Sequence, residues 1–274
     1  MNALVDEKLS IITSKPQTTR HRILSILSGE DFQIVFSDTP GLVDDPNYGL
    51  HRMMNAFSLS SFDDADVMIL VTDAYDSFQA EDPLIPLLRK LEVPKLLVVN
   101  KLDLVPQEKI QQVVNKWTEW VPFDAIHQIS ALEKTGVPEL LENIKSLLPE
   151  GPVYYPKDQL SDRHDRFFVA EMIRGQILQL YSKEIPYACE VQIDAYEEGQ
   201  DLDRIRAIIY VARRTQKAIV IGKDGTAIKK LGIAARQDIE AFLGKQVYLE
   251  LYVKVREDWR DDEKSLRGFG YDNN

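Results

Sequence analysis

Cysteine is almost absent from this chain, which has a single one, Cys189, in 274 residues. A lone cysteine excludes an internal disulfide framework and suits a reducing cytosol. Because no organised base lies near it in the sequence, we expect a small core hydrophobe rather than a nucleophile. Histidine is also scarce, and its four positions lack the spacing of metal ligands: His21, His51, His127 and His164.

Long apolar runs are also lacking. No stretch approaches the roughly 20 apolar residues that span a bilayer, and the N-terminus lacks the charged-then-apolar layout of a signal peptide. The hydrophobic fraction of 44% and the charged fraction of 28% are typical of globular proteins. The length predicts two hydrophobic cores.

The net charge of -11 argues against a surface that binds nucleic acid everywhere. The charge is uneven, however, because residues 204–236 contain nine basic side chains and one acidic side chain, Asp224. Such a local basic excess in an acidic protein indicates a face for a polyanion, although a solvated charged surface is the alternative.

The first half of the chain alternates short apolar runs with helical patterns, which predicts a parallel sheet covered on both faces. The apolar runs, expected as strands, are 32–36, 67–71, 95–99 and 125–129. The helical patterns lie near 51–62, 80–91, 107–119 and 137–148.

The second half has a different pattern, with a helix expected over about 163–183 and three strands of alternating polarity. These strands are 189–195, 205–211 and 247–253. Their alternating polarity, together with the helix, predicts an α+β domain whose sheet has one covered face. Between the halves, residues 148–162 contain three prolines and a glycine and read as a linker. We therefore expect an α/β domain over 1–150, a linker over 151–162 and an α+β domain over 163–274.

The stretch SDTPGL (37–42) directly follows the first expected strand. A carboxylate at the carboxyl end of a strand, followed by a glycine turn, suits a metal–phosphate site in an open α/β sheet. Asp38 can hold Mg²⁺ through water, and the Gly41 amide can donate to a phosphate with no side chain in the way. Asp-Thr-Pro-Gly also makes a good turn, so a purely structural role is the alternative.

NKLD (100–103) and ISAL (129–132) each follow another expected strand. Asp103 offers two acceptors to a planar N–H/NH₂ edge such as that of guanine. Asn100 can bind the base or tie neighbouring loops together, and the stem of Lys101 can cover the face of the base. The backbone amide of Ala131 can meet the guanine O6. Three such motifs in order, each ending a strand, jointly indicate a guanine-nucleotide site.

The stretch VIGKDG (220–225) places two glycines around Lys223 and Asp224, between two short helical patterns. Glycines at Gly222 and Gly225 let a nucleic-acid backbone pass close to the chain, with Lys223 facing phosphates. This pattern resembles the GxxG loop of KH domains. Lys229 and Lys230 add basic charge beside it, and two strands before the loop with one after it suggest the type II arrangement.

In its first half the chain resembles the translation-factor-like GTPases. The resemblance implies that guanine nucleotide is bound by Asp38, Thr39, Pro40, Gly41, Asn100, Lys101, Asp103, Ser130, Ala131 and Leu132. It also implies that QTTRHRI holds switch I, with residues Gln17, Thr18, Thr19, Arg20 and His21. Thr19, with Thr18 as the other candidate, would reach Mg²⁺. Leu42 stands where Ras-like enzymes carry the glutamine that orients the attacking water. This implies slow or assisted hydrolysis, and no general base can be named.

With the type II KH domain included, the whole chain resembles the Era family of bacterial GTPases. That resemblance implies GTP/GDP and Mg²⁺ as ligands, and binding to the 3′ end of 16S ribosomal RNA. It further implies a GTP/GDP switch in small (30S) subunit assembly and 16S rRNA maturation. The expected protein is a cytoplasmic monomer with peripheral association to the inner face of the cell membrane.

One family element is not found in these 274 residues. The only Gly-Lys pairs are Gly222-Lys223 and Gly244-Lys245, and neither continues as the phosphate-binding GxxxxGK[ST]. We therefore expect the chain to begin inside the helix that follows this loop, without the first strand. The alternative function is an RNA-binding form that binds or hydrolyses GTP poorly, and GTP binding by this chain and by an extended one would separate the two.

Overall fold

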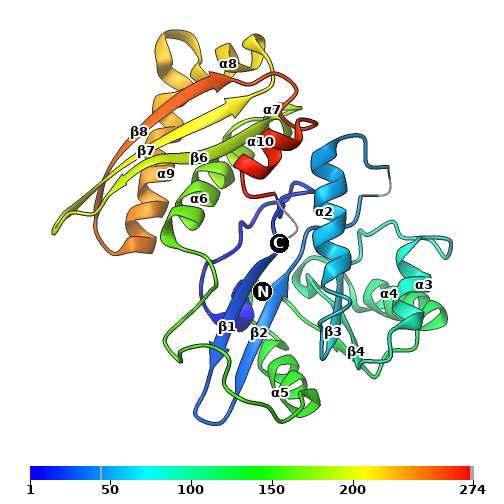
Figure 1. Cartoon of the computed structure of the whole chain (residues 1–274). Helices are drawn as coiled ribbons and strands as arrows, with labels where there is room; N and C mark the ends of the chain where they lie inside the picture. The colour runs from blue at the N-terminus through cyan, green and yellow to red at the C-terminus, as the bar shows by residue number, and fades with distance from the viewer. Residues whose placement is uncertain (44, 272–274) are drawn as a thin grey trace. The chain divides into compact units, whose positions relative to one another are not determined.

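The computed structural model describes residues 1–43 and 45–271 (Figure 1). By spatial contacts the chain divides into two compact units. Unit 1 contains Met1–Glu7, Ser25–Ser37 and Ser58–Leu160, and unit 2 contains Lys8–Leu24, Asp38–Phe57 and Ser161–Asn274. The division into 1–150, 151–162 and 163–274 along the chain remains a proposal.

Unit 1 is built on a parallel sheet of three strands in the order β3-β4-β5. The strands are β3 (Met68–Thr72), β4 (Lys95–Val99) and β5 (Ala125–Gln128). Every residue of β4 is buried, which is expected of a central strand covered on both faces. The helices between and after these strands are α3 (Leu84–Lys90), α4 (Gln107–Trp120) and α5 (Val137–Leu147), and the short α1 (Asn2–Val5) contacts α5.

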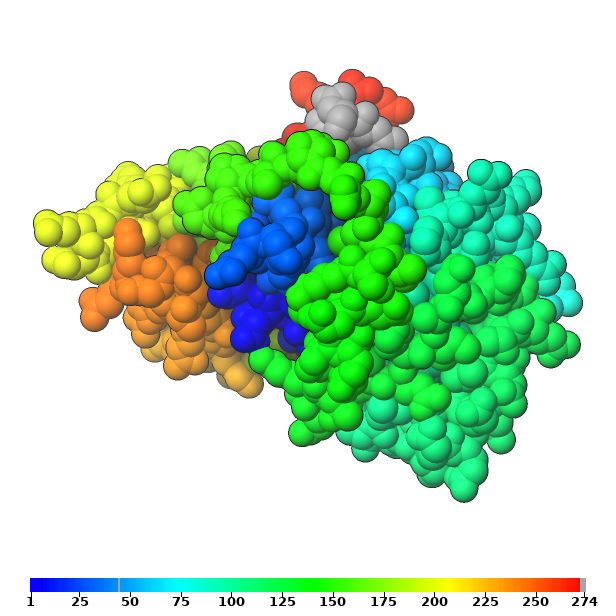
Figure 2. Space-filling model, turned by 90° about the horizontal axis from the view of Figure 1, so that it is seen from below, coloured from blue at the N-terminus to red at the C-terminus, as the bar shows by residue number. Residues whose placement is uncertain are grey.

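A second sheet pairs β1 (Ile23–Ser28) with β2 (Gln33–Asp38). The loop between these strands has only four residues, which suits an antiparallel hairpin. The stretch after α5 lies against this hairpin, and Figure 2 shows it in green beside the blue strands. Gln33 donates to the carbonyl of Tyr155, and Lys157 donates to the carbonyls of Gly29 and Glu30. Residues expected as a linker therefore make defined contacts within unit 1.

Unit 2 contains a three-stranded sheet in the order β6-β7-β8, formed by β6 (Cys189–Glu197), β7 (Leu202–Val211) and β8 (Gln246–Val255). The β6–β7 pair is antiparallel and the β7–β8 pair is parallel. Helices α6 (Asp165–Leu180) and α9 (Thr226–Leu243) pack together against it. The short α7 (Ile185–Ala188) precedes β6, and α8 (Arg214–Ile221) follows β7. This is the type II KH fold that the strand order predicts.

The remaining elements of unit 2 form a smaller apolar cluster. Helix α2 (Gly49–Ser60) contributes Leu50, Met54 and Phe57, and the C-terminal stretch contributes Trp259, Leu266 and Tyr271. The indole N–H of Trp259 donates to the carbonyl of Ala188 at 3.1 Å. Sequence patterns did not predict this cluster, nor the helix α10 (Glu263–Gly268) that belongs to it.

The fold class predicted from the sequence is confirmed: an α/β GTPase-type domain with a parallel sheet is followed by an α+β KH domain. The strands expected at 32–36, 67–71, 95–99 and 125–129 correspond to β2, β3, β4 and β5 within two residues. Strand β1 was missed. None of the helices among the described residues is long and apolar enough to cross a bilayer.

Candidate functional sites

The loops after β4 and β5 meet at the carboxyl edge of the sheet in unit 1. The side-chain oxygen of Asn100 accepts from the amide of Ala131 at 2.9 Å and from the amide of Lys101 at 2.8 Å. Asn100 thus has the tying role that was one of its two predicted roles. Because the Ala131 amide already donates here, a bond from it to guanine O6 requires this donor to be shared or exchanged.

Asp103 is held beside the second loop by a serine. The hydroxyl of Ser130 donates to the carboxylate of Asp103 at 2.6 Å and accepts from the amide of Glu133 at 3.1 Å. Asp103 lies in a short 3-10 turn (Leu102–Leu104) and is exposed, so its second carboxylate oxygen can accept from a ligand. Leu132 is also exposed, at 79%. The structure therefore brings together the residues predicted to read guanine.

The DTPG motif lies at the end of β2, where Asp38 and the residues after it belong to unit 2. One carboxylate oxygen of Asp38 accepts from the hydroxyl of Ser10 at 2.6 Å. Burial raises the pKa of this carboxyl above its ordinary value, while the Ser10 hydrogen bond acts in the opposite direction. Pro40 is buried and Gly41 is exposed, and nothing lies within 4 Å of a Cβ placed on Gly41.

The predicted switch I residues have two different environments within unit 2. Gln17 is exposed, Thr18 and Thr19 are partly buried, and the Thr18 hydroxyl donates to the carbonyl of Lys15 at 2.7 Å. Arg20 and His21, in contrast, are buried. Their side chains belong to the polar core of unit 2.

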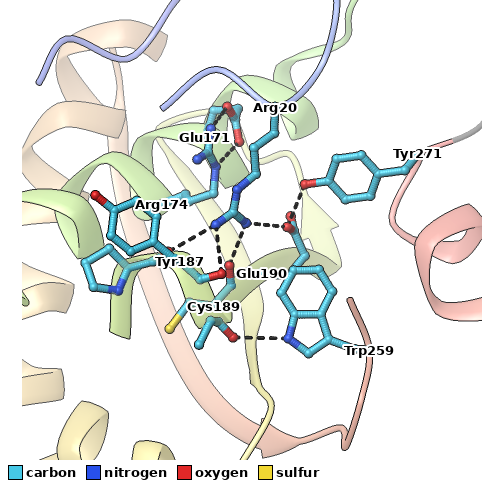
Figure 3. A network of polar contacts seen from close by, with 10 residues as sticks. Arg20, Glu171, Arg174, Tyr187, Cys189, Glu190, Trp259 and Tyr271 are labelled. Carbon is cyan, nitrogen blue, oxygen red and sulfur yellow. Dashed lines mark hydrogen bonds and ion pairs between the residues drawn. The ribbon is translucent and has the colours of Figure 1, made fainter. Parts of the chain in front are cut away.

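Arg20 is the centre of a buried hydrogen-bond network, shown in Figure 3. Its guanidinium donates to the carbonyls of Pro186, Tyr187 and Cys189 and forms an ion pair with Glu190 at 3.0 Å. The five fixed donors of a guanidinium suit this task. Three backbone acceptors, two in α7 and one at the first residue of β6, are therefore satisfied by a residue about 170 positions earlier.

Further charged groups lie in the same core. The hydroxyl of Tyr271 donates to Glu190 at 2.7 Å, and Arg174 forms a two-point ion pair with Glu171 (Figure 3). His21 stacks on Tyr271 with ring centroids 4.2 Å apart, and burial lowers its pKa to about 3. Burial also raises the pKa of Glu190, against the lowering effect of Arg20. The predicted role of Cys189 as a small core hydrophobe is confirmed by its complete burial.

The GKDG loop connects α8 to α9. Gly222 caps α8 with φ 75°, a short 3-10 turn covers Lys223–Gly225, and Gly225 precedes α9 with φ 74°. Asp224 between them has φ 51°, which aspartate tolerates better than most residues. The side chain of Thr226 closes the turn by donating to the carbonyl of Lys223 at 2.8 Å.

The two glycines serve different purposes. A Cβ on Gly222 would lie 2.6 Å from the Cβ of Ala227, so this position must be glycine for the loop itself to close. A Cβ on Gly225 would meet nothing within 4 Å. The surface at Gly225 is therefore open to a ligand, and the side chains of Lys223, Lys229 and Lys230 beside it are exposed.

Apolar side chains flank this basic loop. Ile219 on α8 and Ile233 on α9 are each about half exposed, whereas Leu231, Ala235 and Ile239 are buried in the core. A loop with cationic side chains, an open glycine and adjacent exposed aliphatic groups can hold phosphates and unstacked bases. The pattern expected for single-stranded RNA is thus present in the GxxG region.

Sequence reasoning missed several polar partners. Asp73 comes directly after β3, and its carboxylate forms an ion pair with Lys101 at 2.5 Å. For the other predicted strands, the polar residue directly after the strand was taken as a candidate site residue. The same rule applied to β3 would have identified Asp73. Ser10, Glu190 and Tyr271 carry no such signal. Among the described residues, no group of three or more His, Cys, Asp or Glu side chains gathers as a metal cluster.

Two protein families match parts of the chain. The family described as "50S ribosome-binding GTPase" matches residues 1–101, and the family described as "KH domain" matches residues 184–260. These matches lie in the two halves that the sequence patterns assigned to nucleotide and nucleic-acid binding.

Curated relatives match nearly the whole chain. The protein named GTPase Era of Syntrophus aciditrophicus is 41% identical over 274 residues, covering 99% of this chain and 89% of that protein. GTPase Era of Clostridium kluyveri is 41% identical over 273 residues, covering 99% and 93%. A chloroplastic GTPase ERA-like protein of Oryza sativa is 42% identical over 275 residues, covering 99% and 65%.

Two solved structures are similar over the same extent. A single-residue variant of Aquifex aeolicus Era bound to GDP·AlF₄⁻ has a TM-score of 0.92 and 34% identity, covering 98% of this chain and 93% of that one. Era in complex with MgGDPNP and nucleotides 1506–1542 of 16S ribosomal RNA also has a TM-score of 0.92 and 34% identity, with 98% and 92% covered.

Proposed function

The chain belongs to the Era family of GTPases, and from this premise we propose that it binds guanine nucleotide and 16S ribosomal RNA as a GTP/GDP switch in 30S subunit assembly and rRNA maturation. The observation that carries the nucleotide half is the pair of tied loops after β4 and β5, in which Ser130 holds the carboxylate of Asp103. The observation that carries the RNA half is the open, basic GxxG loop.

Guanine differs from adenine at the edge that Asp103 would face. Guanine presents the N1–H and the exocyclic amine, two donors side by side, and an ionised carboxylate is acceptor-only. Adenine presents an acceptor at N1 and would leave Asp103 facing a lone pair. The loops therefore favour guanine in two ways. The Asp103 carboxylate accepts two hydrogen bonds from guanine, and it is repelled by the N1 lone pair of adenine.

The residues present fit a magnesium ion bound together with nucleotide phosphates. In such sites Mg²⁺ keeps several waters and takes only one or two protein ligands. Asp38 supplies one carboxylate whose pKa is raised by burial, and a nearby cation would favour its ionised form. Thr19 would supply a hydroxyl ligand and Asp38 a water-mediated one. When bound, the ion neutralises phosphate charge. Leu42 has no group that can orient water, so we assign no general base.

On the RNA side, Lys223 and the backbone around Gly225 would contact phosphates, and the exposed Ile219 and Ile233 would lie beside the bases. The relative solved with 16S ribosomal RNA supports RNA of the small subunit as the partner. Within this proposal the protein works in the cytoplasm as a monomer on the 30S subunit.

The proposed recognition of guanine is tested by changing the side chain that would face the base. Asp103→Asn replaces one acceptor with a donor, which matches the O2 carbonyl of xanthine instead of the amine of guanine. Loss of a charged hydrogen bond is worth about 1.5–3 kcal/mol, so GDP affinity should fall about tenfold to a hundredfold while XDP affinity rises. Calorimetric titration of the variant and the parent chain with GDP, XDP and ADP measures this.

Glu133→Gln is the matched control, because it also replaces one exposed carboxylate near the loops, and Glu133 bonds to Ser130 through its backbone amide, which the substitution keeps. It should leave the GDP/XDP ratio unchanged. If the parent chain does not prefer GDP over ADP but binds a 16S 3′-end oligonucleotide tightly, the alternative of an RNA-binding form with poor nucleotide binding replaces the proposal.

A further inference from the structure

The carboxylate of Asp73 makes two contacts directly after β3. One oxygen lies 2.5 Å from the ammonium of Lys101, and the other accepts from the backbone amide of Tyr75 at 2.7 Å. The Asp73 side chain is 13% exposed and that of Lys101 is 50% exposed. The anchor of this pair is therefore mostly covered, while the lysine stem remains open to a ligand.

The loop that presents Asp73 is itself fixed. Asp76 accepts from the hydroxyl of Thr72 at 2.6 Å and from the amide of Asp73 at 3.1 Å. The amide of Asn100 donates to the carbonyl of Thr72 at 2.8 Å, which fixes the end of β3 against the end of β4. Asp73 thus has a defined place relative to the guanine loops before any ligand arrives.

Lys101 is constrained from its backbone as well as from its ammonium. Its φ of 67° and ψ of 39° lie in the left-handed region, and its amide donates to Asn100 at 2.8 Å. A lysine side chain with a free end samples many rotamers, and fixing it on binding weakens affinity. With both ends held, the four-carbon stem has few orientations left.

We propose that Asp73 is a positioning residue of the nucleotide site, which holds the stem of Lys101 where it covers the face of a bound guanine. The inference rests on the proposed guanine recognition by the loops after β4 and β5. It adds the β3–α3 loop to that site and gives a function to a carboxylate that touches no part of the nucleotide.

An ordinary surface ion pair is the competing explanation, and such pairs contribute little to stability. The Asp73–Lys101 pair differs from one because its carboxylate is mostly covered and is tied to the backbone of its own loop. The raised pKa of Lys101, caused first by the hydrogen bond to Asp73, agrees with a persistent contact. Affinity for nucleotide, rather than stability, distinguishes the two explanations.

The test is a double-mutant cycle on the full chain with Asp73→Asn, Lys101→Met and the double variant, titrated with GDP and ADP in Mg²⁺. Each single variant should weaken GDP binding about three- to tenfold, the effect of one unfixed side chain. The double variant should bind no more weakly than Lys101→Met, because Asp73 acts only through Lys101. Glu142→Gln removes the ion pair between the exposed Glu142 and the partly buried Lys145 on α5. It is the charge-matched control and should bind as the parent does.

A second measurement needs no nucleotide. Titration of the Lys101 side chain by NMR should show its pKa move down towards the ordinary lysine value in Asp73→Asn and stay unchanged in Glu142→Gln. Thermal melts check that each variant folds, and if Asp73→Asn does not fold, Asp73→Ser, whose hydroxyl can still accept from the Tyr75 amide, takes its place in the cycle.

The outcomes separate the inference from the function on which it rests. If the parent chain prefers GDP and either single variant binds GDP as the parent does, the inference fails and the proposed function stands. An additive double variant also overturns it, because Asp73 then acts by another route. If the parent chain has no preference for GDP, the proposed function fails and the inference with it.

Discussion

The two polar clusters of this chain use the same kinds of side chain in opposite surroundings. In unit 1, Lys101, Asp73 and Asp103 lie at the open end of the sheet, and two of the three are exposed. In unit 2, Arg20 and Glu190 are almost completely buried, together with three backbone carbonyls. Exposure leaves acceptors and a lysine stem for a ligand, whereas the buried Arg20 and Glu190 are paired with each other inside the protein.

The difference teaches how to separate binding residues from structural ones in a motif. QTTRHRI was predicted as one functional stretch, yet Thr18 and Thr19 are only partly buried while Arg20 and His21 complete a core. Adjacent residues of a single motif thus belong to different physical classes. Each of the following experiments strengthens or breaks that distinction.

The largest effect is expected from Arg20→Met, which keeps the volume and removes the charge. Three carbonyls then lose the donor that Arg20 supplied, and Glu190 loses its ion-pair partner and keeps only the hydroxyl of Tyr271. Breaking such a buried pair costs about 3–5 kcal/mol. Urea unfolding followed by circular dichroism measures the loss. Because Glu190 would take up a proton more readily without its partner, the deficit should shrink at low pH. A loss below about 1 kcal/mol would mean that the network contributes no more than a surface pair.

An exposed site should show the reverse: binding is lost, while stability falls only by the strain of a left-handed φ, which aspartate and asparagine tolerate better than most residues. Gly225→Asp places a carboxylate in open space beside the GxxG loop, where it repels a phosphate at close range. We expect about a hundredfold weaker binding of a 16S 3′-end oligonucleotide at low salt, read by fluorescence anisotropy. Gly225→Asn has the same size without the charge and should retain more of the affinity. Equal loss in both variants would assign the effect to shape.

The buried cluster should also make stability depend on pH through His21. Its pKa is about 3 in the folded protein, against an ordinary histidine value of 6.5, so between these values the unfolded chain binds the proton. Stability from this group is therefore present above pH 6.5 and is lost as pH falls towards 3, by up to about 1.4 kcal/mol per pH unit. His21→Phe keeps an aromatic ring on Tyr271 and should flatten the curve of unfolding free energy between about pH 6 and pH 4. An unchanged slope would contradict the assignment.

The smallest effect is expected from Lys134→Met in unit 1. Lys134 pairs with Asp6, and the two side chains are 61% and 79% exposed. Exposed pairs contribute about 0–1 kcal/mol, so the unfolding free energy should change by no more than that, and less at high salt. A change as large as that of Arg20→Met would show that exposure is not what separates the two kinds of cluster.

Elements with a strong local signal could be predicted from the sequence. KLLVV became the fully buried β4, and the alternating runs of the second half became β6, β7 and β8. Strand β1 was missed because ILSILS mixes serine with its apolar residues and shows neither a continuous run nor strict alternation. Boundaries moved by a few residues where turns, rather than hydrophobicity, end an element.

Side-chain pairing over long sequence distances could not be predicted. Nothing near Arg20 indicates that its acceptors lie at residues 186–190, or that Tyr271 shares one of them, Glu190, because such contacts exist only after the fold has formed. The tie between Asn100 and Ala131 was different. Both residues lie in loops that follow adjacent strands of one parallel sheet. Because the carboxyl ends of parallel strands meet at one edge, these loops are expected to lie close together before any coordinates are known.

The buried indole of Trp259 provides an optical reporter for unit 2. Its N–H is bonded to Ala188, its ring is fully buried, and the only other tryptophans, Trp117 and Trp120, lie in unit 1. In a chain carrying Trp117→Phe and Trp120→Phe, fluorescence would come from Trp259 alone. Its emission should shift to longer wavelength only when water reaches the core around Arg20, so loss of that core can be followed separately from unfolding of the nucleotide-binding loops.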